Sequence, residues 1–307
     1  MRHVAAAGRA GFDAQEETLT EILLTRLGVQ AQVRMFTRRE ESRFTGADWF
    51  WWWTDGHEWF GSLVQAKRLK SSAGKYGFEY KPRATRSNPK PIPQVDRLLE
   101  AARLLGVPAV YSLYSAGNLP SGSVGQCTEW PGYETPRSRL QVSYLPALIA
   151  SHARNAKAAD ILSSAAPIEC LACPGRSRTI SPFVANLAED GDLLAFLRAA
   201  EHGLPRRVAK ALLEPIVELR LGHFRELALE PLDQAEVLND LEVPGSRVFR
   251  SVPLDQGHYA EPYLEHVLRG LRNEPPRYLD ALLDGVPPEE FGAAFQDVRG
   301  VILVSGE

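Results

Sequence analysis

The sequence predicts a mixed α/β fold, in which helices cover the faces of a mixed β-sheet. Over the first 115 residues, helical and strand patterns alternate in the order α, β, β, β, α, β. Aromatic and β-branched residues flank the turn Asp55-Gly56, and an Asp-Gly turn between such runs is a strong signal of a β-hairpin. An antiparallel hairpin beside alternating helices and strands indicates a sheet of mixed strand direction.

Each element of this order has its own local signal. The first helix has Asp13 as its cap and an apolar stripe at helical spacing, and the second ends at Gly106 before Pro108. The expected elements are a helix at 14–27, a strand at 31–35, the hairpin at 46–69, a helix at 94–105 and a strand at 109–114.

The chain is expected to divide into a core at 1–175 and a mainly helical, acidic extension or subdomain at 176–307. Helical patterns are expected within 144–164, and short strands at 168–172, 247–252 and 301–304. The extension is expected to hold helices at 182–201, 206–227, 232–241 and 261–272.

Composition and charge exclude several classes of protein. Hydrophobic residues make up 44% of the 307 residues, which is enough for a core, and the formal net charge of -3 argues against a globally basic nucleic-acid binder. Between Ala31 and Pro93, however, there are twelve Lys and Arg but only six Asp and Glu, so this region either attracts a polyanion or is a solvated charged face. Three cysteines and the absence of a signal peptide or long apolar run lead us to expect a cytoplasmic protein that does not span a membrane.

Three polar residues, Asp48, Gln65 and Lys67, interrupt the otherwise apolar hairpin. Residues two apart on a strand share a face, so Gln65 and Lys67 point the same way. With the turn centred near Gly56 and His57, antiparallel pairing places Asp48 opposite Gln65. Burying such groups costs free energy unless they are paired or bind something. A buried salt bridge between Asp48 and Lys67 is the structural alternative to a binding site.

The oxygen atoms of Asp48, Gln65 and the Ala66 carbonyl form a set of hard ligands, which suits Mg²⁺ or Mn²⁺. Lys67 can then hold an attacking water or neutralise charge on a phosphate. Glu16 or Glu17 of the first helix can add an outer ligand, although a capping role for Glu16 is equally consistent with its position. The chemistry that this set supports is metal-assisted hydrolysis of a phosphodiester.

These residues resemble the PD-(D/E)xK superfamily of restriction-endonuclease-like nucleases. The helix acid, Asp48 at the start of a hairpin strand and Gln65-Ala66-Lys67 on the returning strand are most similar to its Mrr-like branch, which carries Q-x-K. The chain also resembles an uncharacterised bacterial family with the patterns Gly46-Ala47-Asp48-Trp49 and Val64-Gln65-Ala66-Lys67-Arg68-Leu69.

The superfamily resemblance covers about residues 12 to 115 and implies an αβββαβ core. It implies metal ligation by Asp48 and Gln65, catalysis by Lys67, a supporting acid at Glu16 or Glu17, and a place for Gln94 at the site. Cleavage of DNA, in defence against foreign DNA, is the function that it implies. Gln65 departs from the commoner acid, so that either the affinity for the metal is lower or Glu17, Glu40 or Glu41 supplies the missing negative charge.

The stretch from Ser71 to Pro93 is rich in Pro, Gly, Ser and basic residues and predicts a long loop, either functional or disordered. Tyr76 and Tyr80 in this loop suit base stacking. The residues expected to contact nucleic acid are Arg68, Lys70, Lys75, Lys81, Arg83, Arg86 and Gln94.

Other features and functions stay open at this stage. The tryptophans of the hairpin favour core packing over base stacking, and Cys170 and Cys173 are interpreted as buried strand cysteines, since neither Cys127 nor His152 supplies a second zinc-ligand pair. The alternatives to a DNA-cutting enzyme are a module of the same fold that only binds nucleic acid or a partner, and an RNA-cleaving, toxin-like effector. A homodimer and a regulatory partner are also left open.

Overall fold

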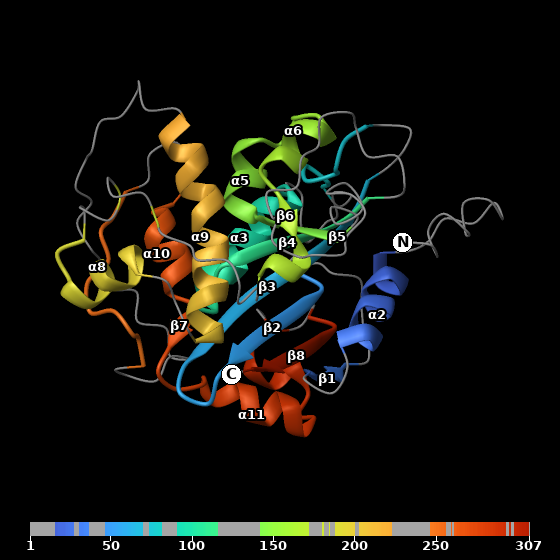
Figure 1. The fold of residues 1–307 in the computed structure, drawn as a ribbon. Helices are drawn as coiled ribbons and strands as arrows, with labels where there is room; N and C mark the ends of the chain where they lie inside the picture. The colour runs from blue at the N-terminus through green and yellow to red at the C-terminus, as the bar shows by residue number, and fades with distance from the viewer. Residues whose placement is uncertain are drawn as a thin grey trace.

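A mixed, open β-sheet runs through the molecule (Figure 1). The computed structural model describes residues 16–27, 31–36, 47–69, 74–81, 91–115, 142–171, 180, 184, 188–199, 203–222, 246–255, 259, 261–292, 295 and 298–306. Within them the sheet has eight strands, of which seven are ordered β1 (Ala31–Met35), β8 (Gly300–Ser305), β2 (Trp49–Thr54), β3 (Trp59–Arg68), β4 (Ala109–Tyr114), β5 (Val142–Pro146) and β6 (Ala166–Pro167). The short β7 (Leu271–Arg272) pairs with the start of β3.

Helices cover both faces of this sheet. The long α9 packs against β2, β3 and β5, and α3 packs with α5 against the opposite face of β3 and β4, while α11 lies against β1 (Figure 1). The helices are α2 (Glu16–Leu27), α3 (Gln94–Leu104), α5 (Ala147–His152), α6 (Ala158–Ser163), α8 (Gly191–Arg198), α9 (Leu204–Gly222), α10 (Tyr263–Leu268) and α11 (Arg277–Asp284), with 3-10 turns η2 (Ile168–Cys170) and η4 (Pro288–Phe291).

The predicted hairpin is confirmed, together with its register. Strands β2 and β3 are antiparallel, and the pairing of Trp49 with Val64 centres the turn between Gly56 and His57. Gly56 has a φ of 86°, a left-handed conformation that glycine adopts without strain. The side chain of Asp55 accepts hydrogen bonds from the backbone N–H groups of His57 at 3.0 Å and Glu58 at 2.9 Å, which closes the turn.

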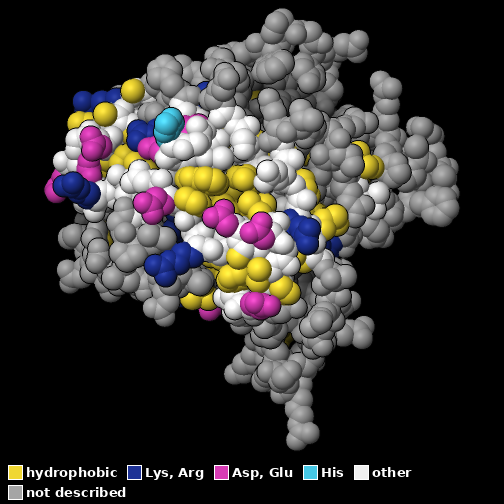
Figure 2. Space-filling view, turned by 90° about the horizontal axis from the view of Figure 1, so that it is seen from below, with side chains coloured by type: hydrophobic (Ala, Val, Ile, Leu, Met, Phe, Trp, Pro, Cys, Tyr) yellow, Lys and Arg dark blue, Asp and Glu magenta, His cyan; other side chains and the backbone are white. Residues whose placement is uncertain are grey.

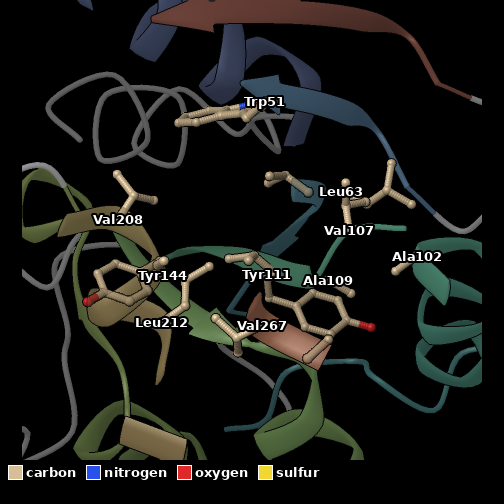
Figure 3. Packing of buried hydrophobic residues seen from close by; sticks show 14 of the residues in the cluster. Trp51, Leu63, Ala102, Val107, Ala109, Tyr111, Tyr144, Val208, Leu212 and Val267 are labelled. Atoms are coloured by element: carbon tan, nitrogen blue, oxygen red, sulfur yellow. The ribbon is translucent and has the colours of Figure 1, made fainter. Parts of the chain in front are cut away.

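The tryptophans of β2 are core residues, as the packing interpretation predicted. Trp51 and Trp53 face α9, where they surround a small void with Leu212, whereas Phe50 and Trp52 face α11 and contact Tyr278. Figure 3 shows Val208 and Leu212 of α9 beside Tyr144 of β5. Burying an aromatic side chain of this size contributes about 1.5–3 kcal/mol, so the hairpin is anchored on both faces.

Two of the later strand predictions are wrong and one is confirmed. The expected strand at 168–172 is the 3-10 turn η2, because Pro167 ends β6. The helical pattern at 144–164 holds α5 and α6, although it begins as strand β5. Short apolar runs do not distinguish helix from strand by periodicity alone. The expected strand at 247–252 is reduced to an isolated bridge between Arg247 and Arg272, whereas the expected strand at 301–304 is β8.

The C-terminal strand is an interior strand of the sheet. β8 lies between β1 and β2, parallel to β2 and antiparallel to β1. The predicted division at residue 175 stays a prediction, but the sheet crosses it, because β8 contributes to the same core as the hairpin. This insertion brings the residues just before β8 beside the start of β2.

The α, β, β, β, α, β order expected for the first 115 residues is confirmed as α2, β1, β2, β3, α3 and β4. Among the described residues, none of the helices has the length and apolar character needed to cross a bilayer.

Candidate active site

The hairpin register places Asp48 opposite Gln65, as the position of the turn predicted. Asp48 directly precedes β2, and its backbone N–H donates to the carbonyl of Val64 at 2.9 Å. The backbone carbonyl of Asp48 accepts from the N–H of Arg299 at 2.8 Å. Asp48 is therefore fixed on both sides by neighbouring strands, and its side chain is buried on the sheet face that also carries Gln65 and Lys67.

Protein donors engage both oxygens of the Asp48 carboxylate. Oδ2 accepts from Nε2 of Gln65 at 2.5 Å and from the N–H of Ala66 at 2.9 Å, and Oδ1 lies 3.2 Å from Nε of Arg299. Burial raises the pKa of Asp48 above its ordinary value of 3.8, and Arg299, the Ala66 N–H and Lys67 oppose this rise only in part. A buried carboxylate with a raised pKa is typical of a functional site.

Gln65 and Gln94 form a chain of amides that ends at Asp48. Nε2 of Gln65 also donates to the carbonyl of Ala66 at 3.0 Å, and Oε1 of Gln65 accepts from Nε2 of Gln94 at 3.0 Å. Oε1 of Gln94 is buried and has no hydrogen-bond partner among the described residues. A buried acceptor without a partner costs about 1–3 kcal/mol, so this oxygen indicates a polar group that binds here.

Lys67 lies two residues beyond Gln65, on the same face of β3. Its side chain is buried at 9% exposure but lines the cleft that opens beside Asp48. The positive charge of Lys67 lowers the pKa of Asp48, which shows that the two groups interact electrostatically. Among the described residues, the carboxylate of Asp48 makes its ion pair with Arg299, so the alternative of an Asp48–Lys67 salt bridge does not account for the position of Asp48.

Glu16 of the first helix reaches this site. It is the first residue of α2, and its Oε1 accepts from the backbone N–H of Arg68 at 2.8 Å. Its carboxylate thus contacts β3, whereas a capping residue would bind the first turn of its own helix. Thr20 fastens α2 to β4 through its hydroxyl, which lies 2.8 Å from the hydroxyl of Tyr114. The side chain of Glu17 lies outside the described residues.

A cleft of about 530 Å³ opens over these groups. Its described lining carries more basic than acidic side chains, in keeping with the local positive charge of the sequence. The lining residues are Glu16, Asp48, Gln65, Lys67, Arg68, Lys75, Tyr76, Gly77, Glu79, Tyr80, Gln94, Arg154, Asn155 and Arg299.

The two tyrosines of the predicted loop have different environments. Tyr76 is buried against Phe78, and its hydroxyl lies 2.7 Å from that of Ser115, so its ring is not available for base stacking. Tyr80 is 60% exposed at the rim of the cleft. Its backbone carbonyl accepts from the N–H of Gln94 at 2.9 Å, which places the exposed ring at the start of α3.

The remaining predicted residues fall into two groups. Arg68 and Lys75 line the cleft, Lys81 is exposed, and Gln94 is buried in the amide chain, where it contacts Gln65. Five lie outside the described residues: Glu40, Glu41, Lys70, Arg83 and Arg86.

The comparisons with known proteins place the chain in a family. The model of DUF6615, a family of unknown function, matches residues 1–306. The chain belongs to DUF6615. Neither a curated protein nor a solved structure matches it. For this DUF6615 protein, function must therefore be argued from the geometry of the cleft.

The residues of the DUF6615 cleft fit a hard divalent cation. The NH₂ group of Gln65 lies between Oδ2 of Asp48 and the Ala66 carbonyl, a position between two oxygens that a cation also favours. An amide can present its oxygen on the same side by rotating its end group, and the set then consists of oxygens only. The Nε2 group of Gln94 now donates to Gln65, so Gln94 would rotate its end group as well, and its partnerless Oε1 could then accept from the reversed Gln65. No cluster of three His, Cys, Asp or Glu suited to a metal occurs within the described ranges, so the amide and carbonyl oxygens are essential to this fit.

Arg299 is the residue of the DUF6615 site that the sequence did not reveal. It is far from Asp48 in the chain and reaches it only because β8 is inserted beside β2. The expected strand at 301–304 was the one signal available, but its place in the sheet is a property of the whole fold. Cys170 is buried as predicted, although in η2 and not in a strand, and Cys127 and Cys173 lie outside the described residues.

Proposed function

We propose that this DUF6615 protein is a divalent-metal-dependent nuclease that hydrolyses DNA phosphodiesters, built on a restriction-endonuclease-like core. One observation carries the proposal: Asp48, Gln65, Lys67 and Glu16 line a single cleft beside the hairpin, and the Ala66 carbonyl contacts Gln65 at 3.0 Å. The order α2, β1, β2, β3, α3, β4 supports the core, to which β8 is added between β1 and β2.

Each residue has a chemical role that follows from its position. Asp48, Gln65 and the Ala66 carbonyl would hold Mg²⁺ or Mn²⁺, and Gln94 would orient the amide of Gln65. The bound cation supplies a nucleophilic water near neutral pH and offsets negative charge on the phosphate. The ammonium of Lys67 orients that water or stabilises the charge that develops on the phosphate oxygens. Arg68 and Lys75 attract the nucleic-acid backbone, and Tyr80 offers a ring to a base.

The proposal is tested by incubating the purified protein with plasmid DNA, single-stranded DNA and RNA in the presence of Mg²⁺ or Mn²⁺. We expect cleavage of DNA that a chelator abolishes and that Asp48→Ala and Lys67→Ala each reduce at least about 100-fold, as is typical for loss of one charged catalytic group. Lys157→Ala, which removes an exposed lysine that does not line the cleft, is the control. Unchanged cleavage by either cleft variant would contradict the assigned site.

One observation favours a second function, a module that binds nucleic acid without cutting it. Both carboxylate oxygens of Asp48 are engaged by protein donors, as in a site that has no cation to hold. This alternative predicts salt-dependent DNA binding with no metal-dependent product. Filter binding separates the two functions, because binding should survive Lys67→Ala in both, whereas only the nuclease loses a product.

A further inference from the structure

Arg299 holds the carboxylate that the proposed metal site requires. Its Nε lies 3.2 Å from Oδ1 of Asp48, and its backbone N–H donates to the carbonyl of the same residue at 2.8 Å. The side chain of Arg299 is 15% exposed, so this contact is shielded from water more than a surface ion pair is. The backbone of Arg299 is held beside Asp48 by its hydrogen bond, so only the side chain of Arg299 is able to move away from the carboxylate.

A cation at Oδ1 of Asp48 would lie beside the guanidinium of Arg299, and the two positive charges would repel each other. The other oxygen, Oδ2, already accepts two hydrogen bonds, and the Gln65 donor is released when its amide rotates. Rotation of Gln65 frees Oδ2 but leaves the positive charge of Arg299 beside the carboxylate. The guanidinium cannot be neutralised by losing its proton, so its positive charge opposes a cation at Asp48 unless Arg299 withdraws.

The cleft provides an alternative partner for this guanidinium. Arg299 lines the same cleft as Lys67 and Arg68, in which the backbone of a nucleic acid would lie. A phosphate accepts two parallel hydrogen bonds from a guanidinium and is a strong partner for arginine. By contrast Arg154, which lines the cleft as well, is held by both oxygens of Asp96 at 2.6 and 3.0 Å.

We propose that Arg299 competes with the divalent cation for Asp48, and that a nucleic-acid phosphate in the cleft draws Arg299 away. The inference rests on the proposed function, since it concerns the same metal site. Because coupling between two ligands is reciprocal, nucleic acid strengthens cation binding and the cation strengthens nucleic-acid binding. Arg299 therefore keeps the site closed to metal until a substrate is present.

The first test measures Mn²⁺ binding by isothermal titration calorimetry in the absence of nucleic acid. We expect Arg299→Gln to bind Mn²⁺ at least about tenfold more tightly than the unaltered protein, in line with the loss of one charge-assisted contact. Arg299→Lys, which keeps the charge, and Arg154→Gln, which removes a charge held by Asp96, should stay within about twofold of the unaltered protein. A merely structural role for Arg299 predicts the opposite sign, with weaker Mn²⁺ binding by Arg299→Gln.

The second test leaves Arg299 in place. In a Lys67→Ala background, which prevents turnover, a short single-stranded DNA oligonucleotide should tighten Mn²⁺ binding about tenfold, and adding Arg299→Gln should remove this gain. Equal Mn²⁺ affinities with and without the oligonucleotide, or weaker binding by Arg299→Gln, would overturn the inference alone. Failure of every protein to bind Mn²⁺ under both conditions would refute the proposed function itself.

Discussion

Asp48 is buried where its charge does not stabilise the fold. Burial raises its pKa above 3.8, so the folded protein binds a proton on this group more readily than the unfolded chain does. Because the pKa of Asp48 is raised in the folded state, the contribution of this group to the free energy of unfolding is fully present below pH 3.8. It is lost as the pH rises through the pKa of the folded state. The charged form of Asp48 therefore gives a lower free energy of unfolding than the protonated form does.

The variant Asp48→Asn separates function from stability. We expect its nuclease activity to fall at least about 100-fold, while its melting temperature stays the same or rises, because the amide removes the buried charge. Differential scanning calorimetry at pH 7 measures the second effect. A marked drop in the melting temperature would show that the charge of Asp48 serves to hold the hairpin together, which the account excludes.

At the scale of single residues, the sequence predicted the pairs that depend on local geometry. The period of two along a strand placed Gln65 and Lys67 on one face, and the turn position placed Asp48 opposite Gln65. The contact of Glu16 with Arg68 depends on the docking of α2 against β3, which no local pattern reveals. Neither Arg299 nor the partnerless oxygen of Gln94 has a local signal, because both arise from contacts between distant segments.

At the scale of elements, the hairpin depends on a close approach between Trp52 and Gly61. The two residues pair across β2 and β3, and a Cβ atom on Gly61 would lie 2.6 Å from the ring of Trp52. The fully buried ring occupies the space above the glycine, where it also contacts Phe50 and Tyr278. Gly61 is therefore required for packing, although its backbone conformation is an ordinary one.

The variant Gly61→Ala tests this contact. We expect it to lower the free energy of unfolding by about 1–3 kcal/mol, the usual cost of overpacking a core, as measured by urea denaturation. Gly77→Ala is the matched control, because a Cβ at Gly77 meets nothing within 4 Å and should change stability by less than about 0.5 kcal/mol. Equal stability of the two variants would contradict the packing argument.

Elements were predictable where two signals agreed. The hairpin combined a turn motif with strand residues, and α3 combined an apolar stripe with a Gly106-Pro108 stop. The end of strand β5 was mistaken for the start of a helix, because the residues from Tyr144 to Ala150 form one continuous apolar run that passes into α5. The sequence holds no boundary there apart from Pro146, which suits a strand end and a helix start equally.

At the scale of the whole molecule, the order of strands assembles the site from four distant segments. The first helix supplies Glu16, the hairpin supplies Asp48 and Gln65, α3 supplies Gln94, and the segment before β8 supplies Arg299. Figure 2 shows acidic side chains among hydrophobic ones over the middle of the face seen from below Figure 1, where α11 lies. A polyanion would be attracted to that face less than to the cleft, whose described lining carries more basic than acidic residues.

A buried histidine links the helical region to the sheet and should make the whole fold sensitive to acid. Nε2 of His266 in α10 accepts from the N–H of Ala109 at 3.3 Å, and Nδ1 lies 2.6 Å from Oε1 of Glu261, which also pairs with Arg269. Burial lowers the pKa of His266 below its ordinary value of 6.5, and the negative charge of Glu261 opposes this only in part. Below pH 6.5 the unfolded chain therefore binds a proton at His266 more readily than the folded protein does.

We expect the contribution of His266 to the free energy of unfolding to be fully present above pH 6.5. Below pH 6.5 the free energy of unfolding should fall, with a slope of up to about 1.4 kcal/mol per pH unit for one proton. Urea denaturation between pH 7.5 and 5 measures this slope. The variant His266→Gln should flatten it, whereas His152→Gln, which changes an exposed histidine, should not. An unchanged slope in His266→Gln would show that the histidine is protonated in the folded protein.

The central claim is that Asp48, Gln65 and the Ala66 carbonyl form a site for a divalent cation, and a crystal grown with Mn²⁺ and a DNA oligonucleotide tests it most directly. We expect an anomalous peak that contacts Asp48 and the Ala66 carbonyl, with the amide of Gln65 rotated to present its oxygen and Arg299 moved from Asp48. A structure at saturating Mn²⁺ with no peak in the cleft, and with Gln65 and Arg299 still bound to Asp48, would contradict the claim.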